Sequence, residues 1–222
     1  MTRVLYLHGF ASGPASAKGR AFQQYFAERG VAVECLDLRR PSLPHLRLSA
    51  IIAEIERAIA GDPVVLVGSS LGGRAAARVA EKSSLVQRIV LLAPAFRLFE
   101  RWRQRLGDAA WARWEETDSL EVLDHTTGGT ANVDFGFIRD GARVDAEGGS
   151  WPIATVPTWI AHGRRDDVVD IELSRQWSAM SPAMTQLVEF DDDHQLIASL
   201  PALLPQAYEF LRPALGPKTG AK

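Results

Sequence analysis

Several features are scarce in this sequence, and each scarcity narrows the possibilities. There is one cysteine, Cys35, among 222 residues, so no intramolecular disulfide can form and the fold does not depend on oxidation. Basic residues number 25 and acidic residues 27, which leaves a net charge of −2. Such a balance provides no basic surface for nucleic acid or for an anionic membrane, so we expect neither partner.

Long apolar runs are also missing. No run approaches the ~20 residues that a transmembrane helix needs. The start of the chain, with its short apolar run at residues 4–7, does not resemble a secretory signal. Apolar residues nevertheless make up 46% of the chain, which is enough for a substantial core. These observations predict a soluble, cytoplasmic, globular protein and leave its oligomeric state open.

Six short apolar runs alternate with longer segments of helical periodicity. The runs cover residues 4–7, 31–36, 64–67, 89–92, 157–161 and 185–190. Apolar residues recur at helical spacing within residues 16–29, 46–60, 71–81, 171–180 and 197–211. Continuous apolar runs are typical of strands covered on both faces. The alternation therefore predicts an α/β fold, a three-layer α/β/α sandwich with a mostly parallel sheet of about six strands.

The alternation is interrupted between residues 95 and 151. Residues 96–114 have the periodicity of one helix, and residues 133–138 and 142–144 flank a turn-like Arg-Asp-Gly, which predicts a hairpin. We interpret residues 95–151 as a cap-like insertion in a single domain that spans residues 1–215. A separate second domain is the alternative, but roughly 55 residues is small for one. The small, polar residues 216–222 are typical of a flexible tail.

The strongest motif directly follows the third apolar run and reads Gly68-Ser69-Ser70-Leu71-Gly72. This is the G-x-S-x-G pattern in which a nucleophilic serine stands on a sharp turn between a strand and a helix. Glycines two residues before and after the serine remove side chains that would collide in the turn. A phosphate-binding loop is the alternative, but its lysine is absent. The pattern predicts Ser70 as a nucleophile, with Ser69 as a weaker rival that lacks the preceding glycine.

A second motif, His8-Gly9-Phe10, follows the first strand. In proteins with such a serine turn, backbone N–H groups stabilise the oxyanion that forms when the serine attacks a carbonyl. We expect the N–H groups of Phe10 and Leu71 to provide this oxyanion hole, with Ala11 as a neighbouring possibility. His8 itself is interpreted as a brace for the loop.

A candidate acid follows the fifth strand, where the chain reads His162-Gly163 and then, three residues later, Asp166. A carboxylate in this loop can reach a histidine across the ends of the strands, where it fixes the imidazole tautomer and stabilises the imidazolium. Asp167 and Asp170 are rivals in the same loop. The spacing favours Asp166.

A candidate base, His194, lies between the last strand and the last helix. With it, the chain order becomes Ser70, Asp166, His194, which is the order found in the α/β-hydrolase fold. His45 and His125 lie before a helix and in the insertion, where they compete poorly for this role. No cluster of cysteine and histidine has the spacing of a zinc site, and the chemistry requires no metal or organic cofactor.

With these motifs in place, the chain resembles the α/β-hydrolase superfamily over nearly its whole length. Residues 5–18, Leu-Tyr-Leu-His-Gly-Phe-Ala-Ser-Gly-Pro-Ala-Ser-Ala-Lys, together with residues 68–73, are similar to small bacterial YqiA-like esterases. This resemblance implies hydrolysis of carboxylic esters or acyl thioesters by Ser70, Asp166 and His194. The sequence departs from many members at Asp193, where they have glycine, and in the insertion.

The expected reaction is hydrolysis of a small-molecule acyl ester or thioester through an acyl-enzyme intermediate. A peptidase, a lactone hydrolase or a C–C bond hydrolase could use the same three residues. A binding protein that kept the fold and lost turnover is an alternative of a different class. Candidates for contact with the substrate are the aromatic residues Phe10, Phe96, Phe99 and Trp102, although helical spacing also fits a role in the core of the insertion.

Overall fold

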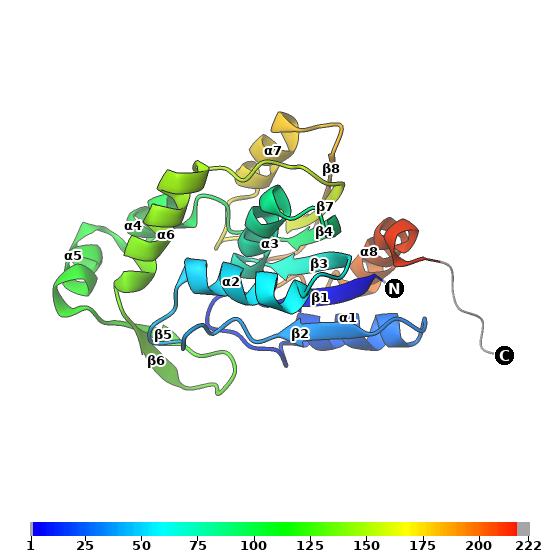
Figure 1. Ribbon diagram of the computed structural model, residues 1–222. Coiled ribbons are helices and arrows are strands. Elements are labelled where there is room, and N and C mark those ends of the chain that lie inside the picture. Colours follow the sequence, from blue (N-terminus) through cyan, green and yellow to red (C-terminus); the bar gives the residue numbers. More distant parts are fainter. Residues whose placement is uncertain (1, 217–222) are drawn as a thin grey trace.

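A sheet of six parallel strands, in the order β2-β1-β3-β4-β7-β8, forms the centre of the molecule (Figure 1). The computed structural model describes residues 2–216, so the predicted tail lies outside the described residues except for Gly216. The strands are β1 (Arg3–Leu7), β2 (Val33–Leu36), β3 (Val64–Ser69), β4 (Val86–Leu92), β7 (Thr158–Gly163) and β8 (Thr185–Phe190). The predicted parallel sheet is confirmed.

Helices cover both faces of this sheet and produce two hydrophobic cores. On one face lie α1 (Ala17–Ala27) and α8 (Leu200–Leu215), and on the other lie α2 (Leu48–Ile59), α3 (Leu71–Lys82) and α7 (Ile171–Met180). Side chains of each strand alternate between the cores, because successive residues of a strand point to opposite faces. In β1, Tyr6 packs with Phe22 of α1, whereas Leu5 and Leu7 join the core beneath α2 and α3. The predicted three-layer sandwich is confirmed.

Because every strand of the sheet runs in the same direction, the loops that follow them meet at one edge. The loops after β1, β3, β7 and β8 carry His8, Ser70, Asp166 and His194 respectively. Ligands of open parallel sheets bind at this carboxyl edge. None of the helices within residues 2–216 has the length and apolar character needed to cross a lipid bilayer.

The insertion between β4 and β7 lies beyond the carboxyl edge of the sheet (Figure 1). It contains α4 (Leu98–Leu106), α5 (Asp108–Thr117), β5 (Leu120–Leu123), β6 (Thr130–Val133) and α6 (Gly136–Gly148). The single helix predicted for residues 96–114 is two helices, because Gly107 at their junction has a φ of 78°. A positive φ of this kind favours glycine and ends a right-handed helix.

The hairpin predicted around residues 139–141 is wrong. Those residues lie inside α6, and the hairpin of the insertion is formed by β5 and β6, which pair antiparallel. Gly141 suggested a turn, but it faces the ring of Phe99, where a Cβ would overlap the aromatic carbons. Glycine at this position therefore permits close packing between α6 and α4. Phe137, Ile138 and Gly141 are buried along one side of the helix.

Candidate active site

Ser70 occupies a strained turn between β3 and α3. Its φ is 52° and its ψ is −114°, a conformation that costs a non-glycine residue about 1–3 kcal/mol and persists only when the surroundings impose it. A Cβ at Gly68 would lie 2.5 Å from the carbonyl oxygen of Gly72. A Cβ at Gly72 would overlap the carbonyl oxygens of Leu7 and His8. The glycines of the motif thus allow the turn that exposes the serine hydroxyl.

The structure brings Ser70, His194 and Asp166 into one hydrogen-bonded chain. Nε2 of His194 lies 3.2 Å from Oγ of Ser70, and Nδ1 lies 2.7 Å from Oδ2 of Asp166. Since the carboxylate can only accept, Nδ1 carries a hydrogen, and in the neutral imidazole Nε2 is then free to accept from the serine hydroxyl. An imidazole held in this way can remove the hydroxyl proton when the serine attacks.

Asp166 is held by four donors although its side chain is fully buried. The backbone N–H groups of Val168 and Val169 each donate to Oδ1 at 2.8 Å. Oδ2 receives His194 and also Nε2 of His162, at 3.1 Å. Burial alone would raise the pKa of the Asp166 carboxyl, but the hydrogen bonds from His162 and His194 hold this pKa well below its usual range. The residue is therefore a carboxylate at neutral pH.

His162 is a part of the site that sequence reasoning did not assign. Its imidazole is fully buried, with Nε2 2.9 Å from the carbonyl oxygen of Val169 and Nδ1 2.8 Å from the hydroxyl of Ser174. A carbonyl oxygen only accepts, so Nε2 carries the hydrogen and points it toward both Val169 and Asp166. The signal in the sequence was a histidine at the end of a buried strand, four residues before the acid.

The loop that carries His194 is shaped by the aspartates before it. Asp192 accepts hydrogen bonds from the backbone N–H groups of Asp193 and Ser199, each at 2.8 Å. Asp193, where the family resemblance led us to expect glycine, accepts from the N–H of Gln195 at 2.8 Å. Side chains that bond nearby backbone in this way fix turns. The aspartate at position 193 is thus compatible with an ordered histidine loop.

The loop after β1 lies directly against the serine. A Cβ at Gly9 would lie 3.3 Å from Cβ of Ser70, so the backbone of this loop approaches the hydroxyl closely. The N–H groups of Phe10 and Leu71 donate to no protein acceptor within residues 2–216. Unpaired N–H groups beside a nucleophile are the kind of donor that an oxyanion hole uses.

His8 fastens this loop to the neighbouring segment. Its Nε2 accepts a hydrogen bond from the backbone N–H of Leu38 at 3.0 Å, and its Nδ1 donates to the carbonyl oxygen of Gly9 at 2.8 Å. Burial lowers the pKa of the imidazole, which favours this neutral tautomer. The geometry fits a bracing role.

The insertion also contacts the loop after β1. The backbone N–H of His125, just beyond β5, donates to the carbonyl oxygen of Ala11 at 2.9 Å. Nε of Arg39 donates to the carbonyl oxygen of Ser12 at 2.9 Å, and its guanidinium lies 3.4 Å from Asp124. Ala11 has a φ of 51°. The hairpin loop of the insertion therefore helps to hold a strained stretch of backbone next to the serine.

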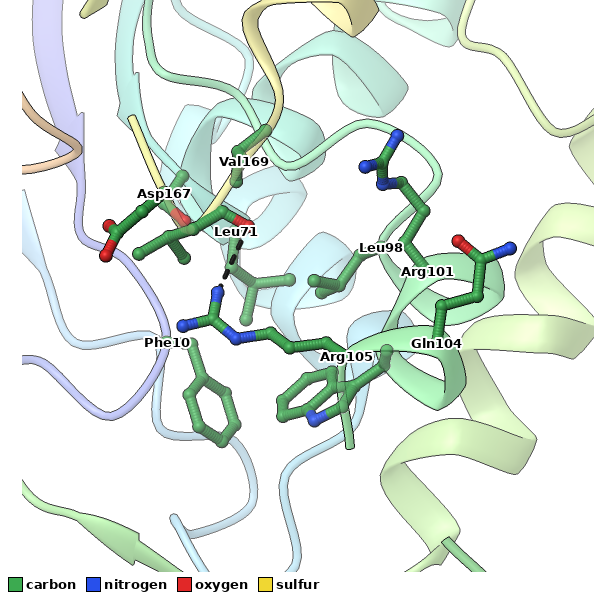
Figure 2. Close-up of a pocket in the computed structure, with 11 residues that line it drawn as sticks. Phe10, Leu71, Leu98, Arg101, Gln104, Arg105, Asp167 and Val169 are labelled. Carbon is green, nitrogen blue, oxygen red and sulfur yellow. Dashed lines mark hydrogen bonds between the residues drawn. The ribbon is translucent and has the colours of Figure 1, made fainter. Parts of the chain in front are cut away.

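An apolar cavity of about 490 Å³ opens beside Ser70, between the insertion and the loop after β7. Figure 2 shows the side chain of Arg105 reaching across it from α4, where its guanidinium donates to the carbonyl oxygen of Val168 at 3.1 Å. Apolar side chains form most of its lining, from Phe10, Leu71, Leu98, Trp102, Val168 and Val169, and the polar residues at its wall are Ser70, Arg101, Gln104, Arg105 and Asp167.

Of the four aromatic residues proposed to contact substrate, the structure places two in this cavity. Phe10 and Trp102 line it, with ring centroids 5.0 Å apart. Phe96 and Phe99 lie elsewhere, because both are buried in packing between the insertion and the sheet. Phe96 stacks on Trp177 of α7 at a centroid distance of 4.8 Å, and Phe99 packs beneath α6. Sequence periodicity could not separate the lining residues from the core.

The rival residues have other partners. Asp170 caps α7 by accepting from the N–H of Glu172 at 3.0 Å, and Asp167 is exposed. Nδ1 of His45 lies 2.6 Å from Oδ2 of Asp134, so this imidazole is engaged by another carboxylate. Within residues 2–216 no group of three or more histidine, cysteine, aspartate or glutamate residues is arranged to hold a metal ion.

A family model identifies the family of the chain. The model of the uncharacterised protein family UPF0227 matches residues 3–212. The chain belongs to the UPF0227 family. The resemblance to YqiA-like proteins that residues 5–18 and 68–73 indicated is thereby confirmed.

Solved structures show the same fold as this UPF0227 member at low sequence identity. Mouse alpha/beta hydrolase domain-containing protein 10 is 18% identical with a TM-score of 0.78, over 95% of this chain and 90% of that one. Est1E from Butyrivibrio proteoclasticus is 21% identical with a TM-score of 0.76, over 96% and 88%. An esterase domain from Rhodothermus marinus is 19% identical with a TM-score of 0.66, over 96% and 87%. The chain thus has the α/β-hydrolase fold, which it shares with esterases.

Proposed function

We propose that this protein is a serine hydrolase that cleaves carboxylic esters or acyl thioesters. The observation that carries the proposal is the continuous hydrogen-bonded chain from the hydroxyl of Ser70 through His194 to the buried carboxylate of Asp166. Three residues far apart in sequence meet at the carboxyl edge of the sheet in the roles that acyl transfer needs. The strained backbone of Ser70 adds support, because such strain gathers at functional sites.

The reaction follows from these positions. His194 removes the proton of Ser70 as its oxygen attacks the acyl carbonyl, and Asp166 stabilises the resulting imidazolium. The N–H groups of Phe10 and Leu71 stabilise the negative oxygen of the tetrahedral intermediate. His194 then gives its proton to the leaving alcohol or thiol. Water, activated by the same imidazole, releases the acid from the acyl-enzyme.

The site favours a small substrate with an apolar acyl part. The cavity beside Ser70 measures about 490 Å³ and is lined largely by apolar side chains. A pocket of this size and character suits a small organic group. Est1E, one of the proteins with the same fold, has been solved with ferulic acid bound. Small esters are therefore the class to test first.

The decisive experiment is hydrolysis of p-nitrophenyl acetate, butyrate and octanoate by the wild type and by Ser70→Ala. We expect turnover by the wild type and a loss of at least about a thousandfold in kcat/KM for the variant, because a missing nucleophile leaves only binding and the oxyanion hole. Labelling with a fluorophosphonate, followed by peptide mass spectrometry, should place the adduct on Ser70.

Other outcomes would point to the alternatives. A wild type that is inert on all three esters but is labelled at Ser70 would favour an amide, lactone or C–C bond as the substrate. A wild type that is inert and resists the fluorophosphonate would overturn the catalytic proposal and leave a binding protein on a hydrolase fold.

A further inference from the structure

A second cavity, of about 410 Å³, also opens at Ser70 and shares Phe10, Arg105 and Val168 with the first. His194 lines this cavity but not the apolar one. Arg105 lines both cavities, whereas Lys18 lines only the second. Asp167 lines the first cavity, and no aspartate or glutamate of residues 2–216 lines the second. The cavity therefore presents positive charge next to the serine in a protein whose net charge is −2.

Lys18 is the central feature of this wall. It lies in the first turn of α1 and only 8% of its surface is exposed, which is rare for a lysine. Its ammonium has three donors, and the protein partner found for it in residues 2–216 is the carbonyl oxygen of His194, at 3.5 Å. No carboxylate of those residues lies within the 4.0 Å of an ion pair. Donors of a buried cation are thus left for a ligand.

A second buried polar group borders the same cavity. The hydroxyl of Tyr6 is shielded from solvent and has no hydrogen-bond partner in the described residues. An unpartnered buried hydroxyl is costly, typically about 1–3 kcal/mol, and calls for an explanation. Ser16 and Ser69, whose side chains lie close to this hydroxyl, line the cavity too. The wall thus combines one ammonium with several hydroxyls, a set suited to an anionic oxygen group.

The chemistry of the proposed reaction decides which part of the substrate enters this cavity. His194 must protonate the leaving group, so the leaving alcohol or thiol has to lie on the side of its Nε2. The cavity that His194 lines is the one with Lys18. The apolar cavity, which His194 does not line, then receives the acyl part.

We propose that Lys18 binds a negatively charged group on the alcohol or thiol part of the substrate. The inference rests on the proposed function and narrows it to esters with an apolar acyl part and an anionic leaving group. Burial lowers the pKa of Lys18 to about 8, and the nearby carboxylates of Asp166, Asp193 and Asp192 oppose that fall. The ammonium therefore remains charged at neutral pH.

The test compares two esters with the same acyl part. One is 3-(butanoyloxy)benzoate, whose leaving group is anionic, and the other is the neutral 3-(butanoyloxy)benzamide. At pH 7 we expect the wild type to favour the benzoate by about tenfold or more in kcat/KM, as a hydrogen bond to a charged group suggests. In Lys18→Met this ratio should fall by at least about tenfold, and in the control Lys82→Met, on the exposed end of α3, it should not change.

A second measurement needs no variant and covers the case in which Lys18→Met does not fold. The product 3-hydroxybenzoate should inhibit p-nitrophenyl butyrate hydrolysis by the wild type at least about tenfold more strongly than 3-hydroxybenzamide. Equal inhibition, or a ratio unaltered in folded Lys18→Met, would overturn the inference. A variant that loses both activities equally would assign Lys18 to holding the His194 loop instead. Failure on every ester, nitrophenyl esters included, would reject the proposed function itself.

Discussion

At the scale of single residues, backbone space matters as much as side-chain chemistry. The serine turn exists because Gly68 leaves room for the backbone of Gly72 and Gly73, and Gly72 leaves room for the carbonyl groups of Leu7 and His8. The carboxylate of Asp166 is ionised because donors surround it, and His162 is one of them. Neither fact concerns the reacting atoms, yet both determine where those atoms lie.

Replacing Gly72 by alanine tests the backbone argument. The new Cβ would overlap the carbonyl oxygens of Leu7 and His8, which precede the Phe10 N–H. We expect a loss of about 1–3 kcal/mol in the free energy of unfolding, as for other overpacked positions, together with a fall in kcat. Gly129→Ala is the matched control, since its nearest neighbour would lie 3.6 Å away. Urea unfolding and ester hydrolysis measure both effects, and a Gly72→Ala protein that matches the control would contradict the argument.

At the scale of helices and strands, the sequence predicted the sheet well and the insertion poorly. Continuous apolar runs identify strands buried on both faces. Ser70, Asp166 and His194 each lie in the loop after such a run, so their meeting was predictable from topology alone. Gly141 was interpreted as part of a turn because local sequence does not show its tertiary contact. The Phe99 ring that leaves no room for a side chain there lies about forty residues away in sequence. For the same reason, the sequence did not predict the contact of His162 with Asp166 or the packing of Phe96 on Trp177. Both depend on how the folded elements pack together.

The insertion is joined to α3 by buried charges. Arg74 and Arg78 of α3 both contact Asp145 of α6, and Arg74 is fully buried with two guanidinium nitrogens unpartnered in the described residues. Burial lowers the pKa of Arg74 and raises that of Asp145, so the ion pair opposes a desolvation penalty. The contact between α3 and α6 therefore requires both the arginines and the carboxylate of Asp145.

Removing the acidic partner should be severe. In Asp145→Asn the buried Arg74 loses its ion-pair partner, while Arg78 keeps Glu81, and we expect the free energy of unfolding to fall by about 3–5 kcal/mol. Glu147→Gln on the same helix removes an exposed ion pair with Arg143 and should change it by less than about 1 kcal/mol. Urea titrations of the two variants make the comparison. Similar midpoints would show that the buried cluster is not what holds α6 to α3.

At the scale of the whole molecule, acidic groups dominate the expected response to pH. Hydrogen bonds and ion pairs oppose burial and lower the pKa of many carboxyls. The group comprises Glu54, Glu100, Asp124, Asp134, Asp140, Asp166, Glu189 and Asp192. A carboxyl whose folded-state pKa lies below its unfolded value stabilises the fold above the unfolded value and loses that effect as pH falls through the folded one.

The melting temperature should therefore decline slightly from pH 7 to about 5, as unfolded but not folded His8 gains a proton, and should fall steeply below about pH 4, the unfolded pKa range of aspartate and glutamate. Differential scanning calorimetry between pH 7 and 3 measures the profile. Asp134→Asn, which loses its ion pair with Arg47, should start lower and fall less. A wild-type profile that stays flat to pH 3 would show that these carboxyls do not stabilise the fold.

The link between His125 and Ala11 bears on how far the insertion can be exchanged as a module. Grafting a different segment between β4 and β7 would remove the backbone donor to Ala11 and the carboxylate of Asp124 that faces Arg39. The neighbouring Phe10 amide would then lose part of its support even though Ser70, His194 and Asp166 had not changed. Exchanging the insertion to change substrate specificity is consequently constrained. A chimera that keeps an ordered loop after β1 needs an insertion that supports the backbone at Ala11.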